Sequence, residues 1–248
     1  MPKCRADQLA VKRGLCPSRA LAQRLIEEGK IRLEDGNALR KSGQLVDEDA
    51  RLVLDAPPKY VSRGAEKLLA GIEAFSPEIE GAVALDLGAS TGGFTDVLLQ
   101  HGARKVYAVD VGHGQLHEKL RNDTRVVSLE GVNARDLDDR IIPERIDILV
   151  GDVSFISLTL VLPPCAPLLK PGAQIIVLVK PQFEAGREAI CSQGVVRDEN
   201  VRRQCVERIL EFARGNLGWQ VIGTVPSPIL GPNGNQEFLA AFSTGRSL

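Results

Sequence analysis

The sequence predicts an α/β protein in which helices cover a mostly parallel, seven-stranded sheet, preceded by a small α+β domain. Two observations predict the sheet. Short runs of β-branched residues alternate with helical segments, and these runs are apolar almost throughout, as in strands that are buried on both faces. A third observation, the pair Pro57-Pro58, predicts a linker. We therefore expect one domain at residues 1–58 and a larger one at residues 59–248.

The N-terminal domain has the signals of two helices followed by two strands. Ser18 follows Pro17 and is a typical N-cap, and Gly29 can adopt the left-handed conformation that ends a helix. The strand signals are short apolar alternations on either side of a turn sequence. The expected elements are helices at 7–13 and 19–28, strands at 30–33 and 51–54, and a turn at 35–36.

The larger domain alternates strands and helices along its whole length. Helical crossovers between strands are typical of parallel pairing. A long amphipathic helix then precedes the last two strands. The expected strands are 83–87, 106–109, 126–129, 146–150, 175–179, 219–225 and 238–242, and the expected helices are at about 92–101, 115–122, 156–169 and 198–214.

Positive charge is concentrated near the N-terminus. The net charge of the chain is −1, but residues 1–32 contain eight Lys or Arg and three Asp or Glu. Such a segment is either an ordinary solvated helical surface or a surface that contacts phosphates. The candidate RNA-binding residues are Lys3, Arg5, Lys12, Arg13, Arg19 and Arg24.

The sequence shows no sign of export or of membrane insertion. No run approaches the roughly 18 apolar residues that span a bilayer, and the charged N-terminus lacks the apolar core of a signal peptide. We therefore expect a cytoplasmic protein that does not contact a membrane. Its five cysteines are scattered, so we expect free thiols. His113 and His117 lack a candidate third ligand, so we expect no metal site.

A glycine-rich loop, Asp86-Leu87-Gly88-Ala89-Ser90-Thr91-Gly92-Gly93-Phe94, joins the first strand of the larger domain to a helix. This is the context in which such loops bind nucleotides, because glycines let the backbone approach a ligand closely. The next strand ends at Asp110, where a carboxylate can accept hydrogen bonds from ribose hydroxyls. Together, the loop and the acidic residue predict a nucleotide-like ligand.

Three other classes of protein fit the loop poorly. The P-loop pattern and the G-x-G-x-x-G spacing of dinucleotide-binding proteins are both missing. Residues 88–92 do match G-x-S-x-G, the nucleophile elbow of hydrolases. That fold needs a catalytic histidine late in the chain, whereas the three histidines stand at 101, 113 and 117. The sequence therefore argues against a hydrolase.

Five stretches carry a resemblance to a known family: YVSRGAEKL at 60–68, DLGASTGGFT at 86–95, DVSFIS at 152–157, VKPQFE at 179–184 and GPNGNQE at 231–237. With them the chain resembles the TlyA family of rRNA methyltransferases, historically labelled hemolysins, whose catalytic domain is FtsJ-like. Residues 3–60 are similar to the alpha-L RNA-binding motif found in a small-subunit ribosomal protein and in pseudouridine synthases.

The resemblance implies a Rossmann-like methyltransferase fold with S-adenosylmethionine as cofactor. It also implies methylation of a cytidine 2′-hydroxyl in 23S rRNA, with 16S rRNA as an open second substrate, and ribosomal RNA or subunits as partners. Carried over by position, the implied Lys-Asp-Lys-Glu tetrad falls on Lys67, Asp152, Lys180 and Glu237. The implied cofactor-binding residues are Asp86, Gly88, Ser90, Gly92, Gly93, Asp110, Asn133 and Ala134.

The chemistry of such a transfer suits these residues. A ribose hydroxyl must lose its proton during or after attack. A lysine amine can take that proton only where burial or a nearby cation favours its neutral form. We expect Lys180, which follows an apolar strand, to be this base, with Lys67 as the cation. Ordinary salt bridges at strand ends are the alternative. Phe155 and Phe183 either flank the target nucleotide or pack in the core.

Two other functions remain open from the sequence alone. A non-catalytic RNA-binding or ribosome-assembly factor could keep the same fold without methyl transfer. A membrane-active hemolysin would need an apolar or strongly amphipathic segment, and the sequence has none that supports this function.

Overall fold

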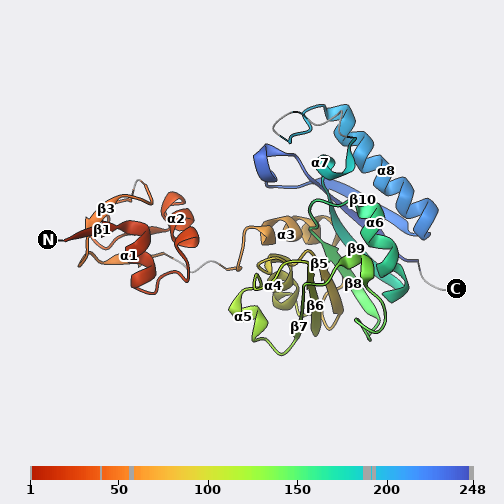
Figure 1. Cartoon of the computed structure of the whole chain (residues 1–248), viewed down its shortest axis with the longest axis horizontal. Coiled ribbons are helices and arrows are strands. Elements are labelled where there is room, and N and C mark those ends of the chain that lie inside the picture. Colours follow the sequence, from red (N-terminus) through yellow and green to blue (C-terminus); the bar gives the residue numbers. More distant parts are fainter. Residues whose placement is uncertain (1, 40, 56–58, 187–190, 192–193, 246–248) are drawn as a thin grey trace. The chain divides into compact units, whose positions relative to one another are not determined.

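The computed structural model describes residues 2–39, 41–55, 59–186, 191 and 194–245. The chain divides into two compact units, Met1–Lys59 and Tyr60–Leu248, which are considered separately below (Figure 1). Pro57 and Pro58, where we expected the linker, lie outside the described residues.

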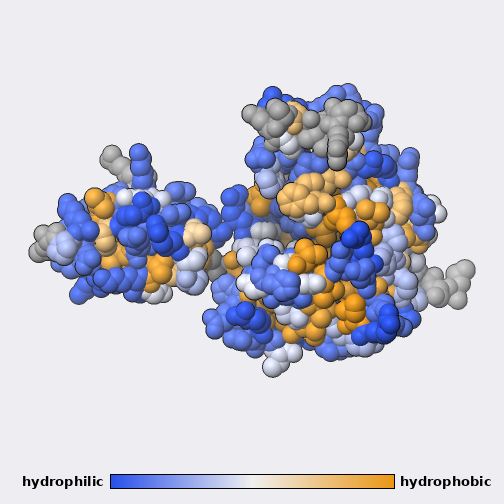
Figure 2. Space-filling view, in the orientation of Figure 1, coloured by the Kyte–Doolittle hydropathy of each residue, from blue (hydrophilic) through white to orange (hydrophobic). Residues whose placement is uncertain are grey.

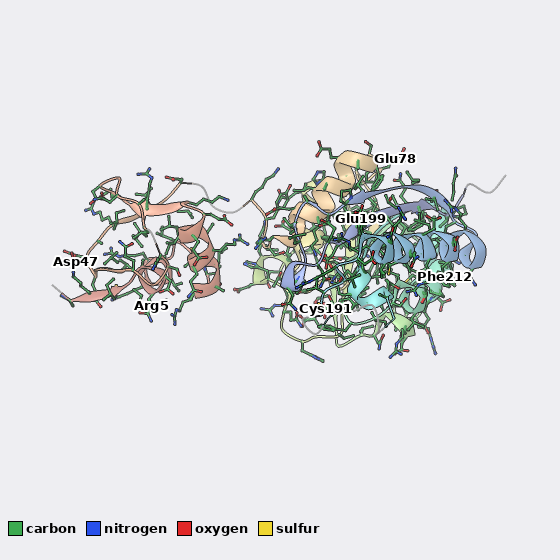
Figure 3. All side chains as sticks on the ribbon, turned by 90° about the horizontal axis from the view of Figure 1, so that it is seen from above. Arg5, Asp47, Glu78, Cys191, Glu199 and Phe212 are labelled. Atoms are coloured by element: carbon green, nitrogen blue, oxygen red, sulfur yellow. The ribbon has the colours of Figure 1, made fainter. Side chains whose placement is uncertain are left out.

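Within its described residues, the N-terminal unit contains two helices and two short antiparallel ladders. Helices α1 (Ala6–Lys12) and α2 (Arg19–Glu27) share a small core with residues of the strands. β1 (Lys3–Arg5) pairs with β3 (Leu45–Asp47), and β2 (Ile31–Leu33) pairs with β4 (Leu52–Leu54). Figure 3 labels Arg5 and Asp47 on the first of these ladders. The α+β character is confirmed, whereas β1 and β3 were not predicted.

The C-terminal unit contains, within the described residues, one sheet of seven strands in the order β10-β11-β9-β8-β5-β6-β7. The five strands from β9 to β7 are parallel, and β11 pairs antiparallel with both β9 and β10. The mostly parallel, seven-stranded sheet is therefore confirmed. The strands are β5 (Val83–Leu87), β6 (Lys105–Asp110), β7 (Val126–Glu130), β8 (Ile146–Gly151), β9 (Leu169–Val179), β10 (Gln220–Pro226) and β11 (Phe238–Ser243).

Helices cover both faces of this sheet because side chains alternate along each strand. Val83, Leu85 and Leu87 of β5 pack into the apolar cluster that holds α6 and α8, whereas Ala84 packs into the cluster on the side of α3 and α4. Glu199 and Phe212 mark the course of α8 in Figure 3. The helices are α3 (Gly64–Phe75), α4 (Gly93–Gln100), α5 (Glu118–Arg121), α6 (Leu158–Cys165), α7 (Pro181–Glu184) and α8 (Glu199–Leu217).

Several element boundaries differ from the sequence prediction. The helix expected at 156–169 is α6, which ends at Cys165 after Pro163 and Pro164, followed by one 3-10 turn. Proline removes backbone donors and so favours an early end. β9 then begins at Leu169 rather than near 175, and α5 is a single turn. Helices α3 and α7 were not predicted.

Candidate active site

The carboxyl ends of the parallel strands bring the expected polar residues to one edge of the sheet. Gly88, Asp152 and Lys180 directly follow β5, β8 and β9, and Asp110 is the last residue of β6. Because β9, β8, β5 and β6 are neighbours in that order, these ends lie side by side. Open α/β sheets bind their ligands at this edge.

The four expected catalytic side chains form one connected cluster. Lys67 Nζ lies 3.1 Å from Asp152 Oδ2 and 2.8 Å from Glu237 Oε2. Lys180 Nζ lies 2.5 Å from Asp152 Oδ1 and donates a hydrogen bond to Ser154 Oγ over 2.8 Å. Two lysine side chains thus share one carboxylate, and a second carboxylate holds one of them.

Lys67 reaches this cluster from α3, whose first turn packs closely on α4. A Cβ atom at Gly93 would lie 2.3 Å from Ser62 Oγ and 3.0 Å from the backbone nitrogen of Ala65. Only glycine allows this approach without a shift of the backbone. The short distance between the two helix starts helps to set the position of Lys67, so Gly93 contributes packing to the site.

Burial and ion pairing compete in the cluster, and ion pairing prevails. Burial raises the pKa of Asp152, but the ammonium groups of Lys180 and Lys67 outweigh it and hold that pKa below its usual value. Burial lowers the pKa of Lys67, but Asp152 and Glu237 outweigh it and raise that pKa. Lys67 is therefore a fixed cation and Asp152 a fixed anion.

Glu237 is fully buried and contacts two side chains on opposite sides. Its Oε2 accepts from Lys67 Nζ, and its Oε1 accepts a hydrogen bond from Gln182 Nε2 over 3.1 Å. Gln182 is itself 8% exposed. Glu237 therefore acts on the site through Lys67, by holding its ammonium group in place.

Two cavities meet at this edge of the sheet. The larger has a volume of about 430 Å³, and its walls include Asp110, Asn133 and Ala134. The smaller has a volume of about 320 Å³, and its walls include Lys67 and Lys180. The residues that line both cavities are Gly88, Ser90, Asp152 and Ser154. A ligand in the larger cavity would therefore adjoin the ion-pair cluster.

Asp110 braces the glycine loop from the neighbouring strand. Its Oδ2 accepts a hydrogen bond from the backbone of Ser90, and its Oδ1 accepts one from Gly112, both over 2.8 Å. Each carboxylate oxygen keeps a second lone pair. Asp110 can therefore hold the loop and still accept hydrogen bonds from ligand hydroxyls in the larger cavity.

Two features set the shape of the glycine loop and the charge beneath it. Gly88 has φ +75°, and a Cβ atom there would lie 2.8 Å from the carbonyl oxygen of Asp152. Asp86, fully buried below the loop, accepts from Thr95 Oγ1 over 2.6 Å, but its Oδ1 has no partner among the described residues. Burial raises the pKa of Asp86 to about 7, and the charges of Asp152 and Asp110 add to this. A cation bound nearby would favour the ionised form of this carboxyl group.

Two of the expected cofactor-binding residues have other contacts. Gly92 has φ +95°, and a Cβ atom there would lie 2.2 Å from Leu120 Cδ1, so this glycine permits close packing of α5. Asn133 Oδ1 accepts a hydrogen bond from the backbone of Arg135 and so caps a 3-10 turn, which keeps Asn133 and Ala134 on the wall of the larger cavity.

Phe155 is an exposed aromatic residue beside the larger cavity. Its side chain is 90% exposed, and its ring centre lies 5.0 Å from that of Phe183. Core packing, one of the two expectations for Phe155, is therefore wrong. Figure 2 shows hydrophobic residues gathered in a band across the visible face of the C-terminal unit, with hydrophilic surface around them.

In the N-terminal unit, a buried carboxylate organises two of the expected RNA-binding arginines. Asp7 is fully buried and accepts hydrogen bonds from Arg5 (2.9 Å), Arg19 (3.3 Å) and Gln23 (2.7 Å). The Arg5 contact is the main reason why the pKa of Asp7 lies well below its usual value. Both arginine side chains remain about half exposed, at 40% and 52%. They can therefore contact a partner while paired.

The remaining basic candidates lie on the same unit, and three of them contact nearby glutamates. Lys12 Nζ lies 3.8 Å from a carboxylate oxygen of Glu48, and Arg13 donates to the backbone oxygen of Glu48. Arg24 pairs with Glu28 one turn later. Lys3 is exposed at the start of β1. These contacts are at the surface, where ion pairs contribute little to stability.

The chain matches two family models and several named relatives. An FtsJ-like methyltransferase model matches residues 60–244, and an S4 domain model matches residues 4–52. The chain belongs to the FtsJ-like methyltransferase family. It is 45% identical to the 16S/23S rRNA (cytidine-2′-O)-methyltransferase TlyA of Mycobacterium tuberculosis, over 95% of this chain and 88% of that protein.

Two further comparisons agree with this membership. The 23S rRNA (cytidine-2′-O)-methyltransferase TlyA of Campylobacter jejuni is 36% identical over 81% of this chain and 79% of that protein. A solved structure from Streptococcus thermophilus, named as a hemolysin, is 44% identical with a TM-score of 0.77 and covers 100% of this chain and 90% of that chain. Both the catalytic methyltransferase class and the N-terminal RNA-binding motif expected from the sequence are thus confirmed.

Three residues of this FtsJ-like site were not singled out from the sequence: Ser154, Gln182 and Glu184. All three stand within the stretches that carried the family resemblance. Their partners lie elsewhere in the chain, so no local spacing indicates the contacts. Gln182 and Glu184 are polar side chains in a short segment just after a buried strand. That position was the sequence signal that could have marked them as site residues.

Among the described residues, no helix is long and apolar enough to cross a membrane. In the same part of the chain, no group of three or more His, Cys, Asp or Glu side chains is arranged to hold a metal ion. His117, one of the two histidines considered above, caps α5 by accepting a hydrogen bond from the backbone of Lys119.

Proposed function

We propose that this protein transfers the methyl group of S-adenosylmethionine to the 2′-hydroxyl of a cytidine in ribosomal RNA. The observation that carries the proposal is the common wall of the two cavities. Asp152 and Ser154 face both the cavity with Asp110 and the cavity with Lys67 and Lys180. A methyl donor and a ribose hydroxyl in these two cavities would meet at that wall.

The larger cavity has the groups that would hold S-adenosylmethionine. Asp110 offers carboxylate oxygens to the ribose hydroxyls of the cofactor, and Gly88, Asn133 and Ala134 also line this cavity. The buried carboxylate of Asp86 favours a positively charged ligand. When bound, S-adenosylmethionine supplies an electrophilic methyl group on a sulfonium.

The ion-pair cluster would prepare the hydroxyl. The amine of Lys180 would accept the proton of the 2′-hydroxyl as that oxygen becomes a nucleophile, and Asp152 would stabilise the ammonium group that results. Asp152 and Ser154 fix the direction of the amine. Lys67, held by Glu237, keeps a second positive charge on Asp152. Phe155 offers an aromatic face on which an unstacked base could lie.

The N-terminal unit would bind the RNA. Arg5 and Arg19 surround Asp7 as paired but half-exposed guanidinium groups, which suits contacts with phosphates. The names of the two TlyA relatives support a ribosomal RNA substrate: one includes both 16S and 23S rRNA, the other 23S rRNA. Because identity is higher to the former, we propose 23S rRNA as a substrate and 16S rRNA as a second one.

The test is methyl transfer by the purified full-length chain. Ribosomal subunits from cells that lack this gene are incubated with S-adenosylmethionine, and each rRNA is digested for nucleoside mass spectrometry. We expect 2′-O-methylcytidine in the 23S rRNA and also in the 16S rRNA, formed by the wild type and not by a Lys180→Arg variant. Binding of RNA without any 2′-O-methylcytidine would instead support a non-catalytic assembly factor.

A truncation tests the division of labour between the units. A chain that lacks residues 1–58 should bind S-adenosylmethionine like the full chain, because the cavity residues all belong to the C-terminal unit. It should fail to methylate rRNA, because its phosphate-binding surface is gone. Methylation at the full-length rate would contradict the proposed role of the N-terminal unit.

A further inference from the structure

Helix α7, together with the lysine that precedes it, contacts the loop after the catalytic aspartate at three successive points. At the start of the loop, Lys180 holds Asp152 and Ser154. In the middle, the ring of Phe183 lies against that of Phe155. At the end, Glu184 holds Ser157 and Leu158, where α6 begins. The segment 180–184 therefore runs alongside the whole loop.

Glu184 makes the last of these contacts with both carboxylate oxygens. Oε1 accepts a hydrogen bond from the backbone nitrogen of Leu158 over 2.8 Å, and Oε2 accepts one from Ser157 Oγ over 2.7 Å. Arg208 of α8 approaches Oε2 to 3.1 Å and also donates to the backbone oxygen of Glu184. The Glu184 side chain is only 1% exposed. A buried carboxylate with this set of donors is firmly placed.

The loop that Glu184 holds has a conformation that needs support. Phe155 has φ +64°, in the left-handed region, which costs a bulky side chain about 1–2 kcal/mol. With 90% of its side chain exposed, Phe155 gains little from burial. Contacts at both ends of the loop must therefore keep this conformation, and Glu184 supplies those at the α6 end.

We infer that Glu184 is a positioning residue for methyl transfer, which holds Ser154 and Phe155 where the target nucleotide enters. This inference rests on the proposed function for its kinetic consequence, but the loop geometry stands independently. Glu184 acts through Ser157 and Leu158 and does not touch the reacting atoms. Its loss should release the loop, which forms one part of the wall of the larger cavity, and leave Asp110, Asn133 and Ala134 in place on the rest of that wall.

The kinetic experiment compares Glu184→Ala and Glu184→Gln with the wild-type full chain on ribosomal subunits. For Glu184→Ala we expect kcat to fall by about 10-fold or more, because a small misplacement of reacting groups is costly. The affinity for S-adenosylmethionine should fall less than kcat, because Asp110, Asn133 and Ala134 stay in place on the cavity wall. Glu184→Gln keeps one acceptor for Leu158 and should recover part of kcat. An unchanged kcat in Glu184→Ala would overturn the inference.

A matched control is Glu144→Ala, at the opposite end of β8. Glu144 also accepts hydrogen bonds from several side chains, Arg104, Lys105 and Tyr107, but it lies at the other edge of the sheet. Its loss should leave kcat within about twofold of the wild type. An equal loss of kcat in Glu144→Ala and Glu184→Ala would indicate general destabilisation and would overturn the inference.

A spectroscopic experiment tests the loop without reference to methyl transfer. Phe155→Trp adds an exposed indole to a chain whose own Trp219 is buried. Nanosecond anisotropy of this probe is measured with and without Glu184→Ala. We expect a larger fast-motion amplitude when Glu184 is absent. Equal amplitudes would overturn the inference, whereas a mobile probe with no methylation by the wild type would reject the proposed function alone.

Discussion

Both units of the molecule contain a carboxylate that holds two cationic side chains, but the two arrangements differ in the exposure of the cations. In the C-terminal unit, Asp152 holds Lys67 and Lys180, whose side chains are 10% and 6% exposed. In the N-terminal unit, Asp7 holds Arg5 and Arg19, at 40% and 52%. The charge state of a buried lysine is sensitive to small changes in its surroundings. Half-exposed guanidinium groups stay charged and accessible.

The difference suggests how one chemical motif serves two purposes. Around Asp152, the paired lysines are buried, and a ligand can approach them from the cavity that they line. Such an enclosed site suits proton transfer and the orientation of reacting groups. Around Asp7, the buried carboxylate fixes the arginines from within while their outer faces meet solvent. Substitutions around Asp152 should therefore change the rate of the chemical step. Substitutions around Asp7 should change RNA affinity and the stability of the N-terminal unit.

The largest expected effect is that of Lys180→Arg. Arginine keeps the positive charge and the pairing with Asp152 but does not deprotonate at accessible pH, so it cannot accept the hydroxyl proton. Methyl transfer should fall by about 10²-fold or more, with folding, cofactor binding and RNA binding retained. Single-turnover assays measure this, and rapid turnover by the variant would leave positioning as the only role for Lys180.

Asp110→Ala should weaken S-adenosylmethionine binding by about 2–3 kcal/mol, the range for hydrogen bonds to a charged group. The structure adds a second cause, because Asp110 also accepts from the backbone of Ser90 and Gly112. Asp110→Asn keeps one acceptor oxygen and should lose less. Calorimetry measures both variants, and unchanged affinity in Asp110→Ala would remove this residue from the binding site.

Asp7→Asn should destabilise the N-terminal unit by about 2 kcal/mol, since a buried carboxylate with three donors is lost while water screens the half-exposed arginines. The folded-state pKa of Asp7 is lowered, so its contribution is present above the unfolded value near 4 and is lost as the pH falls. Thermal unfolding between pH 3 and 7 should show this loss for the wild type and not for Asp7→Asn. If the stabilities of the wild type and of Asp7→Asn fell in parallel with pH, the role given to Asp7 would be contradicted.

The smallest of these effects concerns Asp86. Its pKa, raised to about 7, means that the carboxyl group is largely protonated at pH 5.5 and ionises towards pH 7.5. A cationic ligand favours the ionised form, so the affinity for S-adenosylmethionine should rise over this range by up to about 10-fold. In Asp86→Asn the affinity should be nearly independent of pH. A flat profile in the wild type would show that the ligand charge does not act on Asp86.

Much of the C-terminal unit could be predicted because its signals are local. The apolar runs at 83–87 and 106–109 are buried strands of the sheet, and the glycine loop leaves the first of them as expected. The tetrad positions came from the family resemblance, since ion pairs between residues as distant as 67 and 237 have no local signature.

The missed elements depend on contacts between distant parts of the chain. β1 has three residues and forms by pairing with β3, more than forty residues later. Helix α3 starts without a side-chain cap, and close packing on Gly93 fixes its first turn. The exposed, left-handed Phe155 could not be foreseen from an apolar residue between Ser154 and Ile156, because Phe183 and Glu184, which support its loop, lie almost thirty residues away.

The most direct test of the contrast between the units is the rate of methyl transfer at saturating RNA by a Lys12→Gln/Arg19→Gln double variant. Both side chains are exposed, so their loss should weaken RNA binding and reduce its salt dependence by about one unit of slope for each contact removed. The account predicts that the single-turnover rate at saturation equals that of the wild type. A rate that stays low at saturating RNA would contradict it, because these basic side chains of the N-terminal unit would then take part in the chemical step.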